Sequence, residues 1–409
     1  VLEEGHLTPH GFEPSTEGYA FQSEFVGYEN LSNITKIELI NYDKLSKLEQ
    51  GQKGNIILFE TPFYGEMGGQ VGDTGEIRSL SGRFLVTNTI RVPPDIVVHQ
   101  GYVTEGSLTV GDEVEAIVDK ERRFDIARNH TTTHLLQFAL RQVLGEHVQQ
   151  RGSLVAPDRL RFDFSHLTAM TADEIKEVNH IVNEKIRQNL KVCSEETPYK
   201  KAIEEGAIAL FDEKYGDVVR VIKIGEPAVS IELCGGTHVV STGEIGLFHI
   251  ISESSIGAGL RRIEAVTGRG AEAFIDQRFS DLQEIAEHLG AEPDDVQGKV
   301  SGLITELDKE HRRALALERE LSKKIAESLV NKAEVVRGIT VLATRVPPSR
   351  LQALREMCDL LRERLKSGVI VLGTVCENKP VFLAAVTPDL VARGYDAGEI
   401  VKQVARVTG

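Results

Sequence analysis

The N-terminal part of the chain alternates short apolar runs with glycines and polar turns. From Tyr28 to Asp119 the apolar runs, such as 56–59 and 96–98, are too short for helices. Short apolar runs bounded by turn residues are typical of β-strands. Many such strands in succession favour a small closed sheet. We therefore expect a β-barrel domain over residues 1–119.

The pattern changes at Lys120 to a mixture of helices and strands, which we assign to a second domain over residues 120–270. Apolar residues recur at helical spacing from Glu121 to Leu144, and Gly145 is a suitable stop. The further predicted elements are a strand at 160–165, a helix at 172–189, and strands at 218–224 and 230–233. This mixture indicates an α+β fold.

Residues 271–336 carry an apolar stripe within a charged background. Between residues 282 and 329 Leu, Ile and Val recur every three or four positions, which predicts a coiled-coil-like helical segment. Gly290 and Pro293 are expected to divide it into a shorter and a longer helix.

The stripe must be covered, because each exposed side chain would forgo roughly 1.5 to 3 kcal/mol of burial. Antiparallel pairing of the two helices covers part of it. We expect a second chain to cover the distal end, at Leu321, Ile325 and Leu329.

The last segment, 337–409, has the pattern of a small α/β domain. The predicted elements are a strand at 339–344, a helix at 349–366, strands at 369–375 and 381–386, and a helix at 397–407. The chain as a whole is therefore expected to be α+β.

Composition excludes several classes of protein. With 409 residues, 41% hydrophobic and 27% charged, the chain can bury large cores, and two to four domains are expected. No apolar run reaches the roughly 18 residues that span a bilayer, and residues 1–16 lack a signal peptide pattern. Four irregularly spaced cysteines do not form a disulfide framework. We therefore expect a cytoplasmic protein without membrane contact.

The net charge of −15 argues against nonspecific nucleic-acid binding by the whole surface, because phosphate contacts need clustered Lys and Arg. Any RNA site must be local. Basic residues occur in doublets such as Arg261 and Arg262, and doublets are usually ordinary solvated surface.

Two histidines, His130 and His134, lie at positions i and i+4 of the first predicted helix. Side chains at this spacing share one helix face and can reach one metal ion. Alone the signal is weak, since the glutamate of a His-Glu-x-x-His metalloprotease motif is absent.

A second cluster, Cys234 to His238, strengthens the metal hypothesis. Its adjacent glycines would cost a helix roughly 2 kcal/mol, so a turn is expected that aims both end residues inward. Three imidazoles and one thiolate suit tetrahedral Zn²⁺. The sequence therefore predicts one zinc ion per chain, bound by His130, His134, Cys234 and His238. The alternative, a buried cysteine beside a core histidine, leaves the paired spacing unexplained.

These motifs resemble the editing domain of alanyl-tRNA synthetases. The resemblance is carried by residues 128–136, 161–166 and 234–238, by the barrel segment 61–75, and by the segment 255–266. The final domain is similar to the family's C-Ala domain, which resembles modules of DHH-type phosphoesterases. The chain is identified as a C-terminal fragment of this family, because it lacks the aminoacylation domain that binds ATP. A glycine-rich loop is expected beyond Gly409.

The resemblance implies hydrolysis of serine or glycine esters of tRNA(Ala), with tRNA(Ala) as partner and a homodimer through the C-terminal region. Gln150 aligns with the family's editing glutamine, and Thr132 lies between the two histidines in sequence, two residues from each. These two residues are the expected catalytic polar groups. Gly257 and Gly259 are expected to approach the tRNA 3′ end, with Arg261 or Arg262 on a phosphate.

Several alternatives remain open from sequence. Four protein ligands leave tetrahedral zinc no free position, which is typical of a structural site. The Thr132 hydroxyl could bond its own helix backbone, and Gln150 could be a solvated loop amide. The segment from Gly257 to Arg262 could be a tight turn followed by a strand with outward arginines. The chain could be a non-catalytic tRNA-binding and dimerisation fragment with structural zinc, or resemble free-standing AlaX-type deacylases, which usually lack the helical segment and final domain. A metal-dependent phosphoesterase would need clustered aspartates, such as a DHH run, which the sequence lacks.

Overall fold

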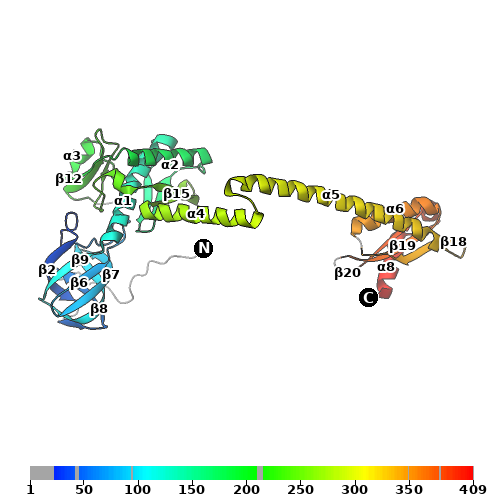
Figure 1. Ribbon diagram of the computed structural model, residues 1–409, viewed down its shortest axis with the longest axis horizontal. Helices are drawn as coiled ribbons and strands as arrows, with labels where there is room; N and C mark the ends of the chain where they lie inside the picture. Colours follow the sequence, from blue (N-terminus) through cyan, green and yellow to red (C-terminus); the bar gives the residue numbers. More distant parts are fainter. Residues whose placement is uncertain are drawn as a thin grey trace. The chain divides into compact units, whose positions relative to one another are not determined.

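The computed structural model describes residues 23–41, 46–93, 95–209, 215–348, 350–376 and 379–408. The chain separates into two compact units, one ending at Phe279 and the other beginning at Ser280 (Figure 1). Residues 1–16, on which the signal-peptide argument depends, lie outside the described residues. Within the described ranges, every helix is too short or too polar to cross a membrane.

The first domain is a closed six-stranded barrel, as expected (blue to cyan in Figure 1). Its strands are β2 (Ser32–Ile40), β4 (Lys53–Leu58), β6 (Gly75–Arg78), β7 (Gly82–Val92), β8 (Ile96–Thr109) and β9 (Glu113–Val118). They pair antiparallel in the order β8-β4-β2-β9-β6-β7, and pairing of β7 with β8 closes the ring. Short strands β1 (Glu24–Phe25), β3 (Lys47–Glu49) and β5 (Glu60–Thr61) lie outside the ring.

One buried polar residue of the barrel is His99, on strand β8. Its Nδ1 lies 2.9 Å from the Ile56 carbonyl, and its Nε2 lies 2.8 Å from the Thr61 hydroxyl. Burial lowers the pKa of His99 to about 4, because a charged imidazolium would lose its hydration there.

The α+β domain is built around helix α1 (Lys120–Leu144) and helix α2 (Ala172–Arg187). One sheet has the order β10 (Gln150–Val155), β11 (Leu160–Ser165), β16 (Leu260–Thr267) and β15 (Phe248–Gly257). A second has the order β12 (Val192–Pro198), β13 (Val218–Ile224) and β14 (Ser230–Leu233), with α3 (Tyr199–Glu204) and the 3₁₀ turn η1 (Thr242–Ile245) nearby in sequence. The expected elements at 121–144, 160–165, 172–189, 218–224 and 230–233 are confirmed within a few residues.

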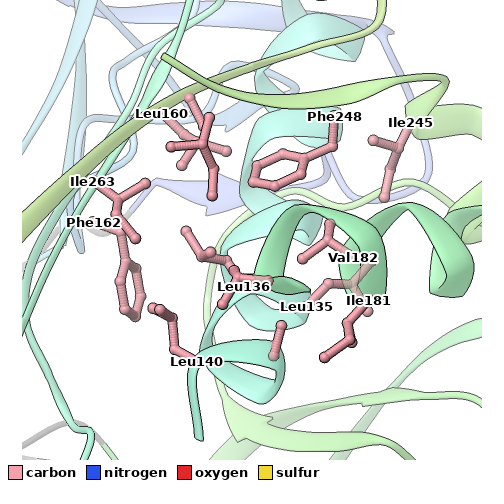
Figure 2. Packing of buried hydrophobic residues seen from close by; sticks show 14 of the residues in the cluster. Leu135, Leu136, Leu140, Leu160, Phe162, Ile181, Val182, Ile245, Phe248 and Ile263 are labelled. Carbon is pink, nitrogen blue, oxygen red and sulfur yellow. The ribbon is translucent and has the colours of Figure 1, made fainter. Parts of the chain in front are cut away.

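Helix α1 begins and ends where the sequence predicts. The Asp119 carboxylate accepts a hydrogen bond from the Arg122 backbone N–H, and Gly145 follows the last turn with φ of 115°. Leu135, Leu136 and Leu140 pack into the domain core with Phe162, Val182 and Phe248 (Figure 2). The apolar face of the helix is therefore packed in the core of the domain. Its polar face carries the two histidines.

The second unit contains the end of α4 (Gly268–Leu289), which begins in the first unit, the 3₁₀ turn η2 (Pro293–Asp295) and helix α5 (Val296–Leu329). Gly290, at φ of 60°, ends α4, so the expected break is confirmed. The final domain follows as η3 (Val330–Lys332), β17 (Glu334–Val336), β18 (Ile339–Arg345), α6 (Leu351–Leu365), β19 (Val369–Cys376), β20 (Lys379–Val386), α7 (Pro388–Val391) and α8 (Ala397–Thr408). Its sheet has the order β17-β18-β19-β20.

Two of the three residues at the distal end of the apolar stripe are covered within the same chain. Ile325 and Leu329 pack into the core of the final domain, with Leu342 and Leu354. The expectation that a second chain covers Ile325 and Leu329 was therefore wrong. Leu321, the third residue of that expectation, is 58% exposed, and further towards the start of α5 Leu307 is 70% exposed.

The depressed pKa of His99 predicts that the stability of the barrel depends on pH. Above pH 6.5 His99 is neutral in both folded and unfolded chains, so it contributes no pH dependence. Between pH 6.5 and about 4 only the unfolded chain takes up the proton, and this site should lower the free energy of unfolding by about 3 kcal/mol.

Hydrogen exchange of β4 and β8 amides in wild type and His99→Gln, each measured at pH 7 and pH 4.5, checks this. The variant should lose part of the acid-induced drop in protection. An equal drop in both proteins would assign the acid sensitivity to other groups.

Candidate metal centre

Four side chains with metal-binding atoms converge in the α+β domain. His130 and His134 come from one face of α1, and Cys234 and His238 come from the loop that follows β14. Their ligand atoms all lie within 4.8 Å of one another. The two clusters found in the sequence therefore form one site.

The donor atoms lie close enough together to share one metal ion. Cys234 Sγ lies 3.3 Å from His130 Nε2 and 3.3 Å from His238 Nε2. His134 Nε2 is buried and makes no hydrogen bond to any described residue. A buried polar nitrogen without a hydrogen-bond partner is costly unless a ligand satisfies it, so the residues fit a bound metal ion.

A partner at Nδ1 fixes the orientation of each imidazole. The Nδ1 atoms of His130 and His238 lie 2.7 Å from Gln70 Oε1 and 3.1 Å from the Thr131 hydroxyl. His134 Nδ1 lies 2.7 Å from a Glu232 carboxylate oxygen, an ion-pair contact that departs from good hydrogen-bond geometry. Such partners commonly orient metal-binding histidines and leave Nε2 for the ion.

Gln70 reaches this site from the barrel domain and is fully buried. Its Oε1 also accepts a hydrogen bond of 2.9 Å from the Thr237 N–H, and its Nε2 donates to the Thr237 hydroxyl at 3.0 Å. One amide thus connects the barrel, helix α1 and the cysteine-containing loop.

The loop between Cys234 and His238 requires glycine at its second position. A Cβ atom at Gly236 would lie 1.9 Å from His130 Cε1, far inside contact distance. On the other side, Arg220 Nη1 donates to the carbonyls of Cys234 and Gly236 at 3.0 and 2.8 Å. The backbone is therefore confined between an imidazole and a guanidinium group.

The charges in this cluster depend on one another. Burial alone would raise the pKa of Cys234, but His130 and His238 hold it well below its usual range. Burial lowers the pKa of His238 to about 3. Burial also acts to lower the pKa of His134, but the Glu232 carboxylate and the Cys234 thiolate outweigh it and raise that pKa to about 10. A thiolate and a neutral His238 are the forms that bind metals, whereas His134 would have to give up its proton when an ion binds.

The two expected catalytic residues, Thr132 and Gln150, differ in how far they are buried. Thr132 is fully buried, and its hydroxyl donates to the Arg128 carbonyl at 2.7 Å, as in the alternative where it bonds its own helix. Gln150 is half-buried and is the first residue of β10, at the edge of its sheet.

The expected tRNA-binding residues lie on the hairpin between β15 and β16. Gly259 has φ of 73°, which favours glycine. Arg261 binds Glu253 at 2.5 and 2.7 Å, and Arg262 binds Asp163 at 2.7 and 2.9 Å. Both guanidinium groups are thus oriented by carboxylates of the same domain.

Sequence reasoning missed Gln70, Thr131 and Glu232. Glu232 offers a signal, because it is an acidic residue in an apolar predicted strand just before Cys234. Gln70 lies in the glycine-rich segment 61–75, but nothing in its local pattern indicates contact with a helix sixty residues away.

Two segments of the chain match models of known protein families. Residues 219–264, which include Cys234 and His238, match the second additional domain of threonyl and alanyl tRNA synthetases. Residues 10–122 match the class II (A) tRNA synthetases. The class that these matches indicate is that of tRNA synthetases, with part of the metal cluster in the second additional domain.

Individual relatives identify the kind of tRNA synthetase. The chain is 54% identical to an alanine–tRNA ligase of Dehalococcoides mccartyi over 388 residues, which are 94% of this chain and 44% of the relative. It is 45% identical to that of Chloroflexus aurantiacus over 399 residues, 95% of this chain and 45% of the relative. The chain belongs to the alanine–tRNA ligase family. It spans less than half the length of these relatives, as expected for a fragment.

Metal binding should depend on the loop geometry as well as on the ligands. The Cys234→Ala, His238→Ala double variant should lose the metal, and Gly236→Ala should lose most of it, because the added methyl displaces His130. Gly257→Ala is the control, since a Cβ there meets nothing within 4 Å. Elemental analysis of the purified proteins measures this. A double variant that retains full metal would refute the site.

Proposed function

We propose that the chain hydrolyses the ester that joins serine or glycine to the 3′ end of tRNA(Ala), as the editing part of an alanine–tRNA ligase in the cytoplasm. The cluster of His130, His134, Cys234 and His238 carries this proposal. Family membership and the match of residues 219–264 support it.

The limited selectivity of an alanine-binding pocket explains why such a reaction is needed. A pocket shaped for alanine cannot strongly exclude glycine, which lacks one methyl group, or serine, which adds one hydroxyl. A second site that hydrolyses the wrong products restores accuracy.

Zinc is the metal that we assign to this site. Three imidazoles and one thiolate form the borderline-soft donor set that zinc prefers. When bound, zinc would supply a positive charge beside the ester and hold the four side chains together. Because all four ligands come from the protein, we assign the zinc mainly to shaping the pocket, and a separate polar group to orienting the water.

Gln150 and Thr132 are the polar groups that we assign to the substrate. Gln150 has both an amide donor and an acceptor, and its half-buried position on an edge strand leaves it accessible. The Thr132 hydroxyl already donates to Arg128, so its role is limited to accepting a hydrogen bond. A serine hydroxyl can donate to such an acceptor, whereas the methyl group of alanine cannot.

We assign contact with the CCA end of the tRNA, next to its terminal nucleotide, to the hairpin that carries Gly257 and Gly259. Neither glycine has a side chain that would block close approach of a ribose. Arg261 and Arg262, on strand β16 beside the hairpin, are the residues that we assign to a phosphate, with their guanidinium groups oriented by Glu253 and Asp163.

The first test is hydrolysis. The chain should deacylate Ser-tRNA(Ala) and spare Ala-tRNA(Ala) by at least about fivefold, the value of one hydrogen bond of roughly 1 kcal/mol. Gln150→Ala and Thr132→Val should reduce the rate or the selectivity. Gln149→Ala is the matched control, because that amide accepts from Arg151 on the surface.

Release of serine from labelled tRNA measures both quantities. If neither variant changes rate or selectivity, the assignment of the polar residues fails. A zinc-loaded chain that binds uncharged tRNA but hydrolyses nothing would support the non-catalytic alternative.

Homodimerisation through the C-terminal region is a further part of the proposal. Exposed apolar residues on α5 support it, including Leu303 at 43% and Leu307 at 70% exposure. Leu303→Ser with Leu307→Ser should shift a dimer towards monomer in sedimentation, with zinc content unchanged. Leu80→Ser, an exposed leucine on the barrel, is the control. A wild-type chain that is monomeric at high micromolar concentration would refute this.

A further inference from the structure

The metal cluster is more exposed at its cysteine-containing loop than at helix α1. His130 and His134 are 6% and 5% exposed, whereas Cys234 and His238 are partly exposed. Gly235, between them in sequence, is also partly exposed and lies against two side chains of the barrel, Tyr28 and Met67. A substrate that approaches the cluster from the side of this loop therefore meets this part of the barrel.

Tyr28 is held in place yet remains open to solvent. Its hydroxyl donates to the Gly235 carbonyl at 2.6 Å, and the Arg220 guanidinium carbon lies 3.9 Å from the ring centroid. The ring of Phe25 packs edge-on against it, with centroids 4.8 Å apart. Even so, Tyr28 is 46% exposed. A fixed aromatic ring with accessible surface loses little entropy when a flat ligand stacks on it.

Met67 and Arg91 continue this surface. Met67 is 39% exposed, and its Cε lies 3.2 Å from where a Cβ of Gly235 would be. Arg91 Nη1 lies 3.4 Å from Met67 Sδ. Arg91 and Arg220 are both close enough to Tyr28 to act against the rise in its pKa that burial causes. An aromatic ring, a thioether and two cations thus lie together beside the metal-binding loop.

This combination matches the chemistry of single-stranded RNA binding. Nucleobases stack on aromatic rings and on arginine planes with little sequence preference, and nearby cations attract the phosphate. In the proposed reaction the scissile ester is on the terminal ribose, so the terminal base must lie within one nucleoside's length of the site.

We infer that Tyr28, Met67, Arg91 and Arg220 form a platform on which the 3′-terminal nucleotide of the tRNA stacks while its ester is hydrolysed. This inference rests on the proposed function. Tyr28 provides the stacking surface, Met67 extends it, and Arg220 holds the ring while supporting the loop carbonyls. Arg91 is the cation for the nucleotide's phosphate.

Two variants of Tyr28 distinguish a role in stacking the nucleotide from a role in supporting the cysteine-containing loop. Tyr28→Phe removes only the hydroxyl that bonds Gly235, whereas Tyr28→Leu removes the aromatic ring as well. Tyr102→Leu is the control, since this barrel tyrosine is also exposed, at 37%, but pairs with Lys53 on β4 in the strand ladder.

Steady-state hydrolysis of Ser-tRNA(Ala) by the whole chain, with zinc content measured in parallel, provides the test. Tyr28→Leu should raise KM roughly five- to 100-fold, the range for one stacked base, with a smaller change in kcat and full zinc content. Tyr28→Phe and Tyr102→Leu should remain within about twofold of wild type.

A second measurement does not require hydrolysis. Binding of uncharged tRNA(Ala) is compared with binding of the same tRNA lacking its terminal adenosine. Removal of the adenosine should weaken binding to wild type but not to Tyr28→Leu.

The outcomes are distinct. Equal losses in Tyr28→Phe and Tyr28→Leu, with loss of zinc, would show that Tyr28 only braces the loop and would overturn the platform. An unchanged KM in Tyr28→Leu would overturn it as well. If wild type hydrolyses nothing, the proposed function fails, and the adenosine-dependent binding still decides whether the platform exists.

Discussion

The buried amide of Gln70 is the contact on which the metal site depends most. It comes from the barrel, accepts from His130 of helix α1, and bonds both the N–H and the hydroxyl of Thr237 in the loop. A polar group so deeply buried is stable only when its bonds are made, so the three parts must assemble together. Nearby, Arg123 Nε binds the Asp73 carboxylate at 3.0 and 2.9 Å, and fixes the first turn of α1 on the same barrel segment.

This constraint explains how a polar stretch can occupy the middle of a helix. Residues 129–134 are all buried, although their side chains are polar. The hydroxyls of Thr132 and Thr133 donate to backbone carbonyls within the helix, and the Thr131 hydroxyl contacts His238 and the Val239 N–H. Only the histidine Nε2 atoms point to the site where an ion would complete the bonding. The stretch is therefore organised for a ligand at its centre.

Local pattern predicted much of this protein. Helix α1, the break after α4 and the strands of the final domain followed from periodicity and glycine positions, and the ligand set followed from spacing. The identity of the strands that close the barrel, β7 and β8, and the partners of the histidines depend on tertiary contacts, which periodicity does not record. Ile325 and Leu329 show the same limit. Their stripe indicated burial, but not that the final domain would cover them.

The barrel contacts the cysteine-containing loop on two sides, through different residues. On the inner side Gln70 limits the motion of His130, and on the outer side Tyr28 bonds the Gly235 carbonyl. Arg220, from β13, supports the carbonyls of Cys234 and Gly236 from that outer side. Since both sides of the loop are held, its position cannot shift without disturbing the barrel as well. Any RNA that contacts the barrel surface near Tyr28 therefore acts on a loop whose geometry also sets the position of Cys234.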